Sequence, residues 1–240
     1  YTFPVQTGPD LTYNGQRDAY VAKVKSDGSG LIYCGYIGGS GYDEATGIAV
    51  DSSGSAYLCG DTASNESTFP VKTGPDLTYN GDGPDAFVSK VKSDGTALVY
   101  CGFIGGDGQE FARSIAVDRF GEVYLCGSTP STEASFPVKI GPDLSHNGSV
   151  DAFVAKVNAS GSALIYCGYI GGSEGDGAYG IAVDSKGNVY VCGYTLSNED
   201  TFPVRNGPDL TFNGFPNGYQ DAFLTKISLR VQPPYDLLLN

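Results

Sequence analysis

The sequence of 240 residues lacks Met and Trp, has a single His, and carries only 14 Lys and Arg against 27 Asp and Glu. This formal net charge of −13 argues against binding to nucleic acid, because that affinity depends on Lys and Arg that neutralise phosphates. It equally disfavours an anionic membrane surface. No apolar run approaches the ~20 residues of a membrane span, so we predict no membrane insertion. An acidic surface suits solubility and cation binding.

The chain is instead rich in repetition. The run FPV…GPDL[ST]xNG…DAF starts at Phe3, Phe69, Phe136 and Phe202, and a second block, LIYCGYIGG…GIAVD…YLCG, recurs three times between these copies with small variations. A fixed period indicates one supersecondary unit stacked on copies of itself. We therefore divide residues 1–229 into repeat units at about 1–68, 69–135, 136–201 and 202–229, the last one partial. Residues 230–240 form a C-terminal extension.

Each period contains four short apolar segments separated by turn signals. In one period we expect strands at 47–51, 55–60, 85–91 and 97–106, with turns at Ser52–Gly54 and Ser93–Gly95. No apolar stripe with a 3.6-residue period appears, so we expect no long helix. Four short antiparallel strands per period are typical of a β-propeller blade.

The repeat resembles the bacterial "seven-bladed β-propeller" (SBBP) repeat in its YxGG, GIAVDxxGxxY and DAFVxK elements, to about Leu229. The GIAVDxxGxxY hairpin is also similar to that of NHL repeats. The resemblance implies an all-β fold of tandem four-stranded blades. In each blade GIAVD would be the innermost strand, followed outward by YLCG, DAFVxKV and LIYCGYIGG.

The expected strands are too few to form a closed ring of blades. The expected strands give a two-strand start (18–38), two full blades (46–104 and 113–170) and a three-strand remainder (179–228), about three and a quarter repeats. Closed propellers usually have four to eight blades. We expect a piece of a longer propeller, closure by dimerisation, or a head-to-tail filament. A start at Tyr1 without Met suggests a mature or trimmed product.

The C-terminal extension contains three adjacent leucines, Leu237, Leu238 and Leu239. They are candidates for assembly, since an apolar segment near a terminus can add to a neighbouring subunit as an extra strand. The alternative is that they pack on the chain's own last blade.

Six cysteines recur in pairs spaced by 25 residues. An even number in register with the repeat suggests disulfides and an oxidising compartment; the alternative is buried, inert thiols. In the strand order that the resemblance implies, two cysteines of one blade lie about 9.6 Å apart, at two strand spacings. That exceeds the roughly 7 Å limit for a disulfide, whereas cysteines of successive blades remain free to pair. The favoured pairs are Cys34/Cys59, Cys101/Cys126 and Cys167/Cys192.

Glycosylation sequons support a location outside the cell. They occur at Asn65, Asn147 and Asn158 and permit glycosylation of a secreted chain. Together with the cysteine pattern they predict an extracellular or cell-surface protein.

Each repeat carries a D-x-[ST]-x-N-G motif followed by a further Asp. Oxygen side chains at positions 1, 3 and 5 with Gly at position 6 resemble the first half of an EF-hand loop, which makes calcium the candidate cofactor. The bidentate Glu of position 12 is absent, and Asp and Asn also cap turns through their own backbone, which is the alternative. The candidate ligands are Asp10, Thr12, Asn14 and Asp18; Asp76, Thr78, Asn80 and Asp85; Asp143, Ser145, Asn147 and Asp151; and Asp209, Thr211, Asn213 and Asp221.

A second acidic cluster precedes each GIAVD segment and reads as a solvated rim. Its members are Asp43 and Glu44, Asp107 and Glu110, and Glu174 and Asp176.

Nothing in the sequence marks a catalytic centre. An active site needs a placed nucleophile, acid–base pair or metal, and it is normally unique, whereas every notable feature here is copied three or four times. The single His146 stands where the other repeats have Tyr13, Tyr79 and Phe212, which indicates an aromatic packing position. We therefore predict a protein that is not an enzyme.

Two functions remain open. The first is an extracellular structural protein whose blades, stapled by disulfides, polymerise head to tail into a filament or surface array, with the chain itself as partner. The second is a secreted, adhesive or lectin-like module that binds glycan or protein through its Tyr- and Asn-containing loops.

Overall fold

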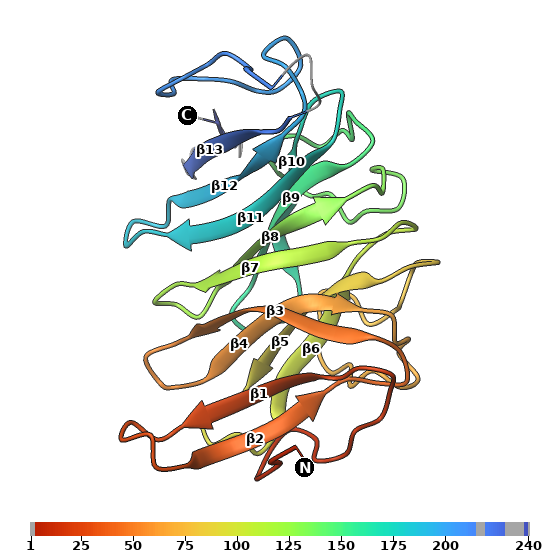
Figure 1. Ribbon diagram of the computed structural model, residues 1–240, viewed down its shortest axis with the longest axis vertical. Helices are drawn as coiled ribbons and strands as arrows, with labels where there is room; N and C mark the ends of the chain where they lie inside the picture. The colour runs from red at the N-terminus through yellow and green to blue at the C-terminus, as the bar shows by residue number, and fades with distance from the viewer. Residues whose placement is uncertain (1–2, 215–218, 229–237, 240) are drawn as a thin grey trace.

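The computed structural model describes residues 3–214 and 219–228, and the backbone of residues 238–239. These residues form strands and no helix; accordingly, none of them belongs to a helix suited to crossing a bilayer. The strands make four antiparallel sheets, stacked along the long axis of the molecule in chain order (Figure 1).

Every sheet is a meander in which strands consecutive in sequence are neighbours. The first sheet contains β1 (Ala19–Val24) and β2 (Leu31–Ile37). The second contains β3 (Asp43–Val50), β4 (Ala56–Thr62), β5 (Asp85–Val91) and β6 (Leu98–Ile104). The third contains β7 (Phe111–Val117), β8 (Val123–Thr129), β9 (Asp151–Val157) and β10 (Leu164–Ile170). The fourth contains β11 (Asp176–Val183), β12 (Val189–Thr195), β13 (Asp221–Ser228) and β14 (Leu238–Leu239).

The predicted all-β fold is confirmed, as are the two-strand start and the two four-stranded sheets that follow it, whereas the last sheet has one strand more than the three predicted. Each complete sheet combines the end of one sequence unit with the beginning of the next, since the second sheet runs from Asp43 to Ile104. Within the described residues no sheet closes on itself, and the first and last sheets lie at opposite ends of the molecule (Figure 1).

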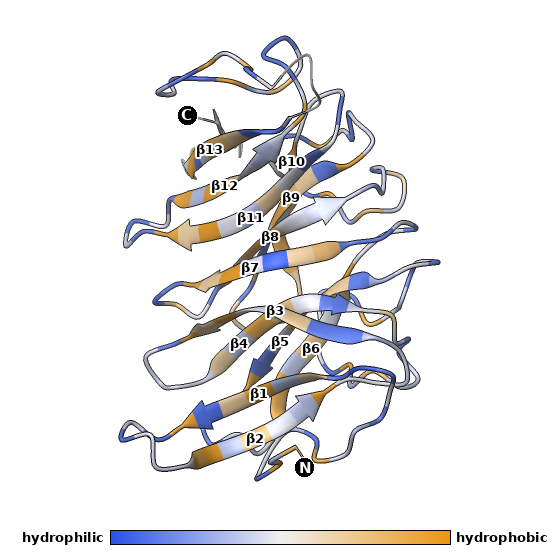
Figure 2. Cartoon of the chain, viewed as in Figure 1, coloured by the Kyte–Doolittle hydropathy of each residue, from blue (hydrophilic) through white to orange (hydrophobic). Residues whose placement is uncertain are grey.

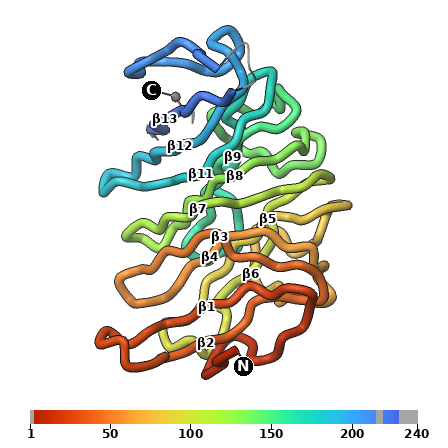
Figure 3. Tube along the Cα trace, viewed as in Figure 1, coloured from red at the N-terminus to blue at the C-terminus, as the bar shows by residue number. Residues whose placement is uncertain are grey.

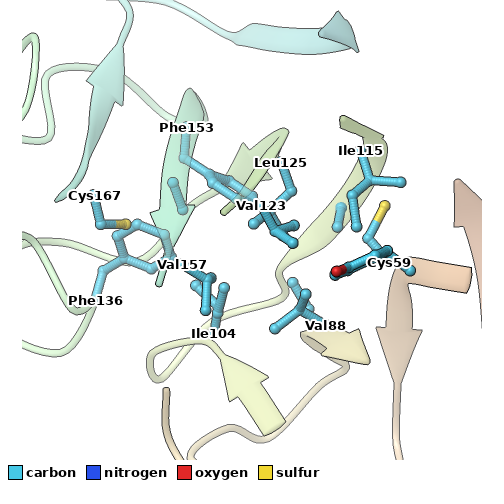
Figure 4. Close-up of a cluster of buried hydrophobic side chains, with 14 of the residues drawn as sticks. Cys59, Val88, Ile104, Ile115, Val123, Leu125, Phe136, Phe153, Val157 and Cys167 are labelled. Carbon is cyan, nitrogen blue, oxygen red and sulfur yellow. The ribbon is translucent and has the colours of Figure 1, made fainter. Parts of the chain in front are cut away.

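The strands alternate their side chains between two apolar interfaces, as the pleat of a strand requires. On β6, Cys101 and Phe103 pack toward the first sheet, whereas Tyr100 and Ile104 pack toward the third. Figure 4 shows the second interface, where Val88 and Ile104 of the second sheet meet side chains of the third. A third cluster joins the third and fourth sheets.

The first strands of successive sheets lie side by side and are joined by hydrogen bonds. Thr46 Oγ1 on β3 donates to the carbonyl oxygen of Ala112 on β7 at 2.6 Å, and the Ile181 amide on β11 donates to Ser114 Oγ at 3.4 Å. Each of these strands has a register shift at its middle, for example between Ala45 and Gly47. Such a bulge bends the strand and increases its twist. The arrangement agrees with first strands on the inner side of a propeller.

The long loop that precedes β5 covers the outer edge of the second sheet. Lys72 and Asp76 form antiparallel bridges with Cys101 and Phe103 of β6. The approach is close because Gly102 meets Gly74: a Cβ on Gly102 would lie 2.5 Å from the Gly74 Cα. The third sheet repeats this arrangement, and the loops run along the side of the stack (Figure 3). Pairing with a loop removes the exposed edge that an outermost strand otherwise presents.

Candidate functional site

The predicted calcium loops are held by hydrogen bonds among their own residues. In the first loop the Thr12 amide donates to Asp10 Oδ1 at 2.8 Å, Asn14 Nδ2 donates to Asp10 Oδ2 at 2.6 Å, and the Asn14 amide donates to Asp18 Oδ2 at 2.8 Å. The other three loops repeat the pattern around Asp76, Asp143 and Asp209. Such hydrogen bonds between Asp or Asn side chains and the nearby backbone are the ones expected if the motif caps turns, which was the alternative to calcium binding.

The described residues hold no group of three or more His, Cys, Asp or Glu side chains gathered as for a metal ion. Positions 1 and 5 of each loop bind each other, and the position-1 carboxylate also accepts from the backbone at position 3. Calcium binding by the sixteen predicted ligands stays a prediction, and the last Asp of each loop is brought to a distinct environment.

The buried members of the second acidic cluster hold the Gly–Gly turn that follows each outermost strand. Asp43 accepts from the Gly39 amide at 2.7 Å, from Ser64 Oγ at 2.9 Å, and from Thr62 Oγ1. Glu110 and Asp176 take the same place in the next two copies. All three carboxylates are buried, so the expectation of a solvated rim is wrong for them. The sequence signal for this cluster is a T-x-S segment that recurs at the end of the second strand of each four-stranded sheet. Both its Thr and its Ser hydroxyls donate to the buried carboxylate in two copies, and the Ser hydroxyl alone does so in the third.

The last Asp of the loop motif lies against the first Gly of the same turn. A Cβ on Gly105 would lie 2.5 Å from Asp85 Cγ, and Gly38 and Gly171 meet Asp18 and Asp151 in the same way. One oxygen of each of these carboxylates, Oδ1, is buried without a hydrogen-bond partner. Burial, which is the largest cause, and the charges of Glu110 and Asp76 together raise the pKa of Asp85 to about 7, although the hydrogen bond from the Asn80 amide lowers it. Each complete Gly–Gly turn thus lies between two buried carboxylates.

The predicted disulfides are wrong: all six cysteines are free thiols. The physical reason is the face that each one occupies. Cys101 packs toward the first sheet and Cys126 toward the fourth, so the second and third sheets lie between them. Cys59 and Cys167 do face the same interface, but they lie on opposite sides of its cluster (Figure 4).

The alternative prediction, that the cysteines are buried thiols in the core, holds for all of them except Cys192 in the last sheet. Burial raises the pKa of Cys59 to about 12 and that of Cys101 still higher. Cys192, which occupies the place of Cys59 and Cys126 in the fourth sheet, is exposed.

His146 packs edge-on against Tyr169, with ring centroids 5.6 Å apart. Tyr13 and Tyr79 pack in the same way on Tyr36 and Phe103, which confirms that His146 replaces a repeated aromatic residue.

The sequons lie in different surroundings. Asn65 is exposed, and its side-chain oxygen accepts from Ser67. Asn147 is also exposed, but its amide group donates to Asp143 and to the carbonyl of Ser145. The amide group of Asn158, which is half-buried, donates to Ser162 Oγ. Asn65 is therefore the sequon that a glycan would disturb least.

In the part of the chain that the structure describes, the outermost strand of the last sheet is the two-residue β14, whereas a seven-residue strand lies under the loop in the second and third sheets. A hollow of about 740 Å³ occupies this position, between β13 and the loop at 202–213, and Phe202, Leu210, Phe223 and Thr225 are among the residues that line it.

Of the three leucines predicted for assembly, Leu238 and Leu239 form β14 on the chain's own last sheet, beside Ser228 and Ile227. This arrangement corresponds to the alternative prediction, in which the leucines pack on the chain's own last blade. Leu237 lies outside the described residues.

The comparison with protein families agrees with this geometry. No curated protein matches the chain. Residues 32–66 and 165–199 match the SBBP family, described as a beta-propeller repeat. Each matched segment runs from an outermost strand through the Gly–Gly turn and the following hairpin to the T-x-S segment. Two segments of the chain are thus similar to the SBBP beta-propeller repeat, and the four-stranded antiparallel sheets are consistent with propeller blades.

Proposed function

We propose that the chain is a non-catalytic assembly protein whose blades stack head to tail on those of a second copy, building a filament or surface array. One repeat position carries the proposal. Val88 and Val154 are 0% exposed because each packs against the following sheet, whereas the equivalent Leu224 in the last sheet is 71% exposed. An apolar residue that is larger than its buried equivalents thus lies on a face against which no sheet of the described residues packs.

The opposite end of the stack presents the complementary surface. Phe87 and Phe153 are fully buried against the preceding sheet, whereas the equivalent Tyr20 is 56% exposed. Phe3 is likewise 40% exposed, whereas its equivalent Phe69 is buried. Apolar stretches lie on the strands of the terminal sheets as they do inside the stack (Figure 2). Exposed apolar patches of this kind mark interaction surfaces.

A second copy of this chain is the occupant that these surfaces favour. The back of one sheet already packs against the front of the next within the chain, at the interfaces of the second with the third and the third with the fourth. The back of the fourth sheet and the front of the first repeat the two halves of that interface. Such a contact joins different surfaces of identical subunits, so it generates a ring if the rotation closes and a filament if it does not.

An extracellular or cell-surface location stays a prediction. Because the six cysteines are free thiols, disulfides no longer support this location, and the sequons are the support that remains. A mass shift of the native protein on treatment with a glycosidase, mapped to Asn65, would support it.

The assembly is tested by blocking each end separately. Leu224→Lys places a charge on the back of the last sheet, and Val24→Lys places one on the front of the first, where Val24 is exposed. We expect wild-type protein to form concentration-dependent oligomers in sedimentation and light scattering, and fibres or rings by electron microscopy. Each variant alone should remain monomeric, because its one blocked end is needed in every contact. An equimolar mixture of the two variants should form dimers and nothing larger.

The matched control is Phe120→Lys, at an exposed aromatic in a hairpin turn of the third sheet. It should assemble as the wild type does. A compact monomer at all concentrations would contradict the proposal, as would a variant mixture that stays monomeric. A wild-type monomer that is retained on a glycan or cell-surface array would favour the adhesive alternative instead.

A further inference from the structure

In the first three sheets the outermost strand lies between two partners. In the second sheet, for example, β6 pairs with β5 on one side and with Lys72 and Asp76 of the loop on the other. In the last sheet β14 pairs with β13 only at Ile227 and Ser228. Residues 222–226 of β13 therefore have β12 on one side and, within the described part of the chain, no strand on the other. An open stretch of sheet edge, which is a template for pairing with another chain, faces the hollow.

The loop on the far side of the hollow keeps the conformation that it has in the filled copies. The Val204 amide donates to the carbonyl oxygen of Phe202 at 2.7 Å, and the equivalent amides in the second and third sheets do so at the same distance. The Phe202 ring stays 5.2 Å from the Phe223 ring of β13, measured between centroids. The loop thus holds its place beside β13 without a long strand between them. A preformed groove avoids much of the ordering cost of binding.

The filled copies show which side chain the hollow lacks. In the second sheet the Phe103 ring of β6 contacts two loop rings, with its centroid 5.5 Å from that of Phe69 and 6.0 Å from that of Tyr79. An aromatic residue of the outermost strand holds the same place in the first and third sheets. The corresponding loop rings of the last sheet, Phe202 and Phe212, both line the hollow. The hollow therefore has a place for a third ring.

The same copies show that the missing strand must carry a glycine. In the second sheet a Cβ on Gly74 of the loop would lie 2.6 Å from the Cα of Gly102 on β6, and the equivalent distances in the first and third sheets are 2.5 and 2.8 Å. Gly207 holds this position in the last loop. The described atoms near a Cβ on Gly207 belong to its own loop, Leu210 Cδ2 at 3.0 Å and the Asp209 carbonyl oxygen at 3.3 Å. Gly207 thus leaves room for the close approach of a strand glycine.

We propose that this groove, between β13 and the loop at 202–213, binds an extended segment of another polypeptide by β-strand addition. The segment runs antiparallel to β13, pairs with residues 222–226, places a Phe or Tyr ring against Phe202 and Phe212, and sets a glycine against Gly207. Its pattern is that of the chain's own outermost strands, YCGFI or YCGYI. In this mode of recognition main-chain hydrogen bonds provide affinity, and pockets for alternate side chains provide specificity.

A different polypeptide is the occupant because the outermost strands of a second copy are already engaged. β2, β6 and β10 each pair with a strand of their own sheet on one side and with a loop on the other. The groove lies at the edge of the last sheet, whereas the proposed stacking of copies uses the back of that sheet. Either proposal can therefore hold without the other.

The experiment measures binding of a synthetic peptide to the full chain, at a protein concentration low enough to keep the chain monomeric. The peptide has the sequence of residues 97–106, with Ser in place of Cys101 and two added lysines for solubility. Fluorescence anisotropy of the labelled peptide should show saturable binding of one peptide per chain, and the amides of residues 222–226 should exchange more slowly in its presence. A matched peptide with Gly102→Ala should bind at least about tenfold more weakly, because its methyl group meets Gly207.

The matched protein variant, Gly207→Ala, places the methyl group on the loop side and should also weaken binding of the original peptide at least about tenfold. Gly30→Ala is the control and should bind as the wild type does, because a Cβ there meets only Lys25 Nζ, at 4.0 Å, among the described atoms. If Gly207→Ala lowers the melting temperature, the Gly102→Ala peptide still tests the same contact on unaltered protein. A wild-type chain that binds no peptide would overturn the proposal. So would binding that neither glycine substitution weakens, because the peptide would then lie outside the groove.

Discussion

The interior and terminal sheets place the same repeat positions in different surroundings. Cys59, Cys126 and Cys192 are one position of the repeat, and so are Phe87, Phe153, Phe223 and Tyr20. In the second and third sheets these residues are buried between neighbours, whereas Cys192 and Tyr20 at the two ends are exposed. The sequence differs little between copies, so burial depends on whether a neighbouring sheet is present. In a stacked array, stability comes largely from the interfaces between repeats.

The largest effect that this comparison predicts is at the Phe153 position. Phe153→Ala removes a fully buried ring between the second and third sheets and should cost about 3–5 kcal/mol of unfolding free energy. Tyr20→Ala at the equivalent exposed position should change the free energy of unfolding by less than about 1 kcal/mol. Urea unfolding, followed at a protein concentration low enough to keep the chain monomeric, measures both. Equal losses would mean that the first sheet is covered in solution, and the comparison would fail.

The strands were predictable because their signals are local. The expected strand at 85–91 is β5 to the residue, and turn residues bound each hairpin. The innermost strand was expected to begin at residue 47, but β3 begins at Asp43. Asp43 is fixed by its hydrogen bond from the Gly–Gly turn, and the bulge between Ala45 and Gly47 lets the strand continue from Asp43 into the predicted segment. Local periodicity does not reveal either feature.

The sites were harder to predict because they depend on which face of a sheet a residue occupies. Cys101 and Cys126 are 25 residues apart in successive sheets, yet they point to opposite ends of the stack. Strand order alone leaves that direction undetermined. Asp43 and Glu110 looked like rim residues because their side chains are polar. The Thr and Ser hydroxyls that make their burial possible come from the end of the next strand and from the segment just after it.

Thiol labelling gives a second, smaller contrast. Cys192 should react with a thiol reagent at least about tenfold faster than Cys59 or Cys126, because the thiolate is the reactive form and the buried thiols are both inaccessible and raised in pKa. Mass spectrometry of briefly alkylated protein should find the modification at Cys192. If copies stack as proposed, this labelling should slow as protein concentration rises. Rapid labelling of all six thiols would contradict the packing of the interior sheets.

The smallest effect concerns the hairpin turn after each innermost strand. Asp51 accepts from the amides of Ser53 and Ser55 and from the Tyr57 hydroxyl, and these bonds outweigh burial to lower its pKa from 3.8 to about 2. A lowered pKa stabilises the folded state above pH 3.8, and the contribution is lost as the pH falls through 2.

Asp51→Asn should therefore lose about 1 kcal/mol near neutral pH, after discounting for solvent, and the difference from the wild type should shrink as the pH approaches 2. The terminal counterpart, Asp184→Asn, should lose less. Asp51 Oδ2 also lies 3.6 Å from Lys90 Nζ. Together with Asp118, Asp51 lines a space between the hairpin turns of two successive sheets. Asp184 has no following turn among the described residues. Urea midpoints of the two variants and the wild type, measured from pH 7 to pH 2, decide the matter. If both variants lose the same amount at every pH, the neighbouring turn adds nothing, and the contrast between interior and terminal sheets is confined to their apolar faces.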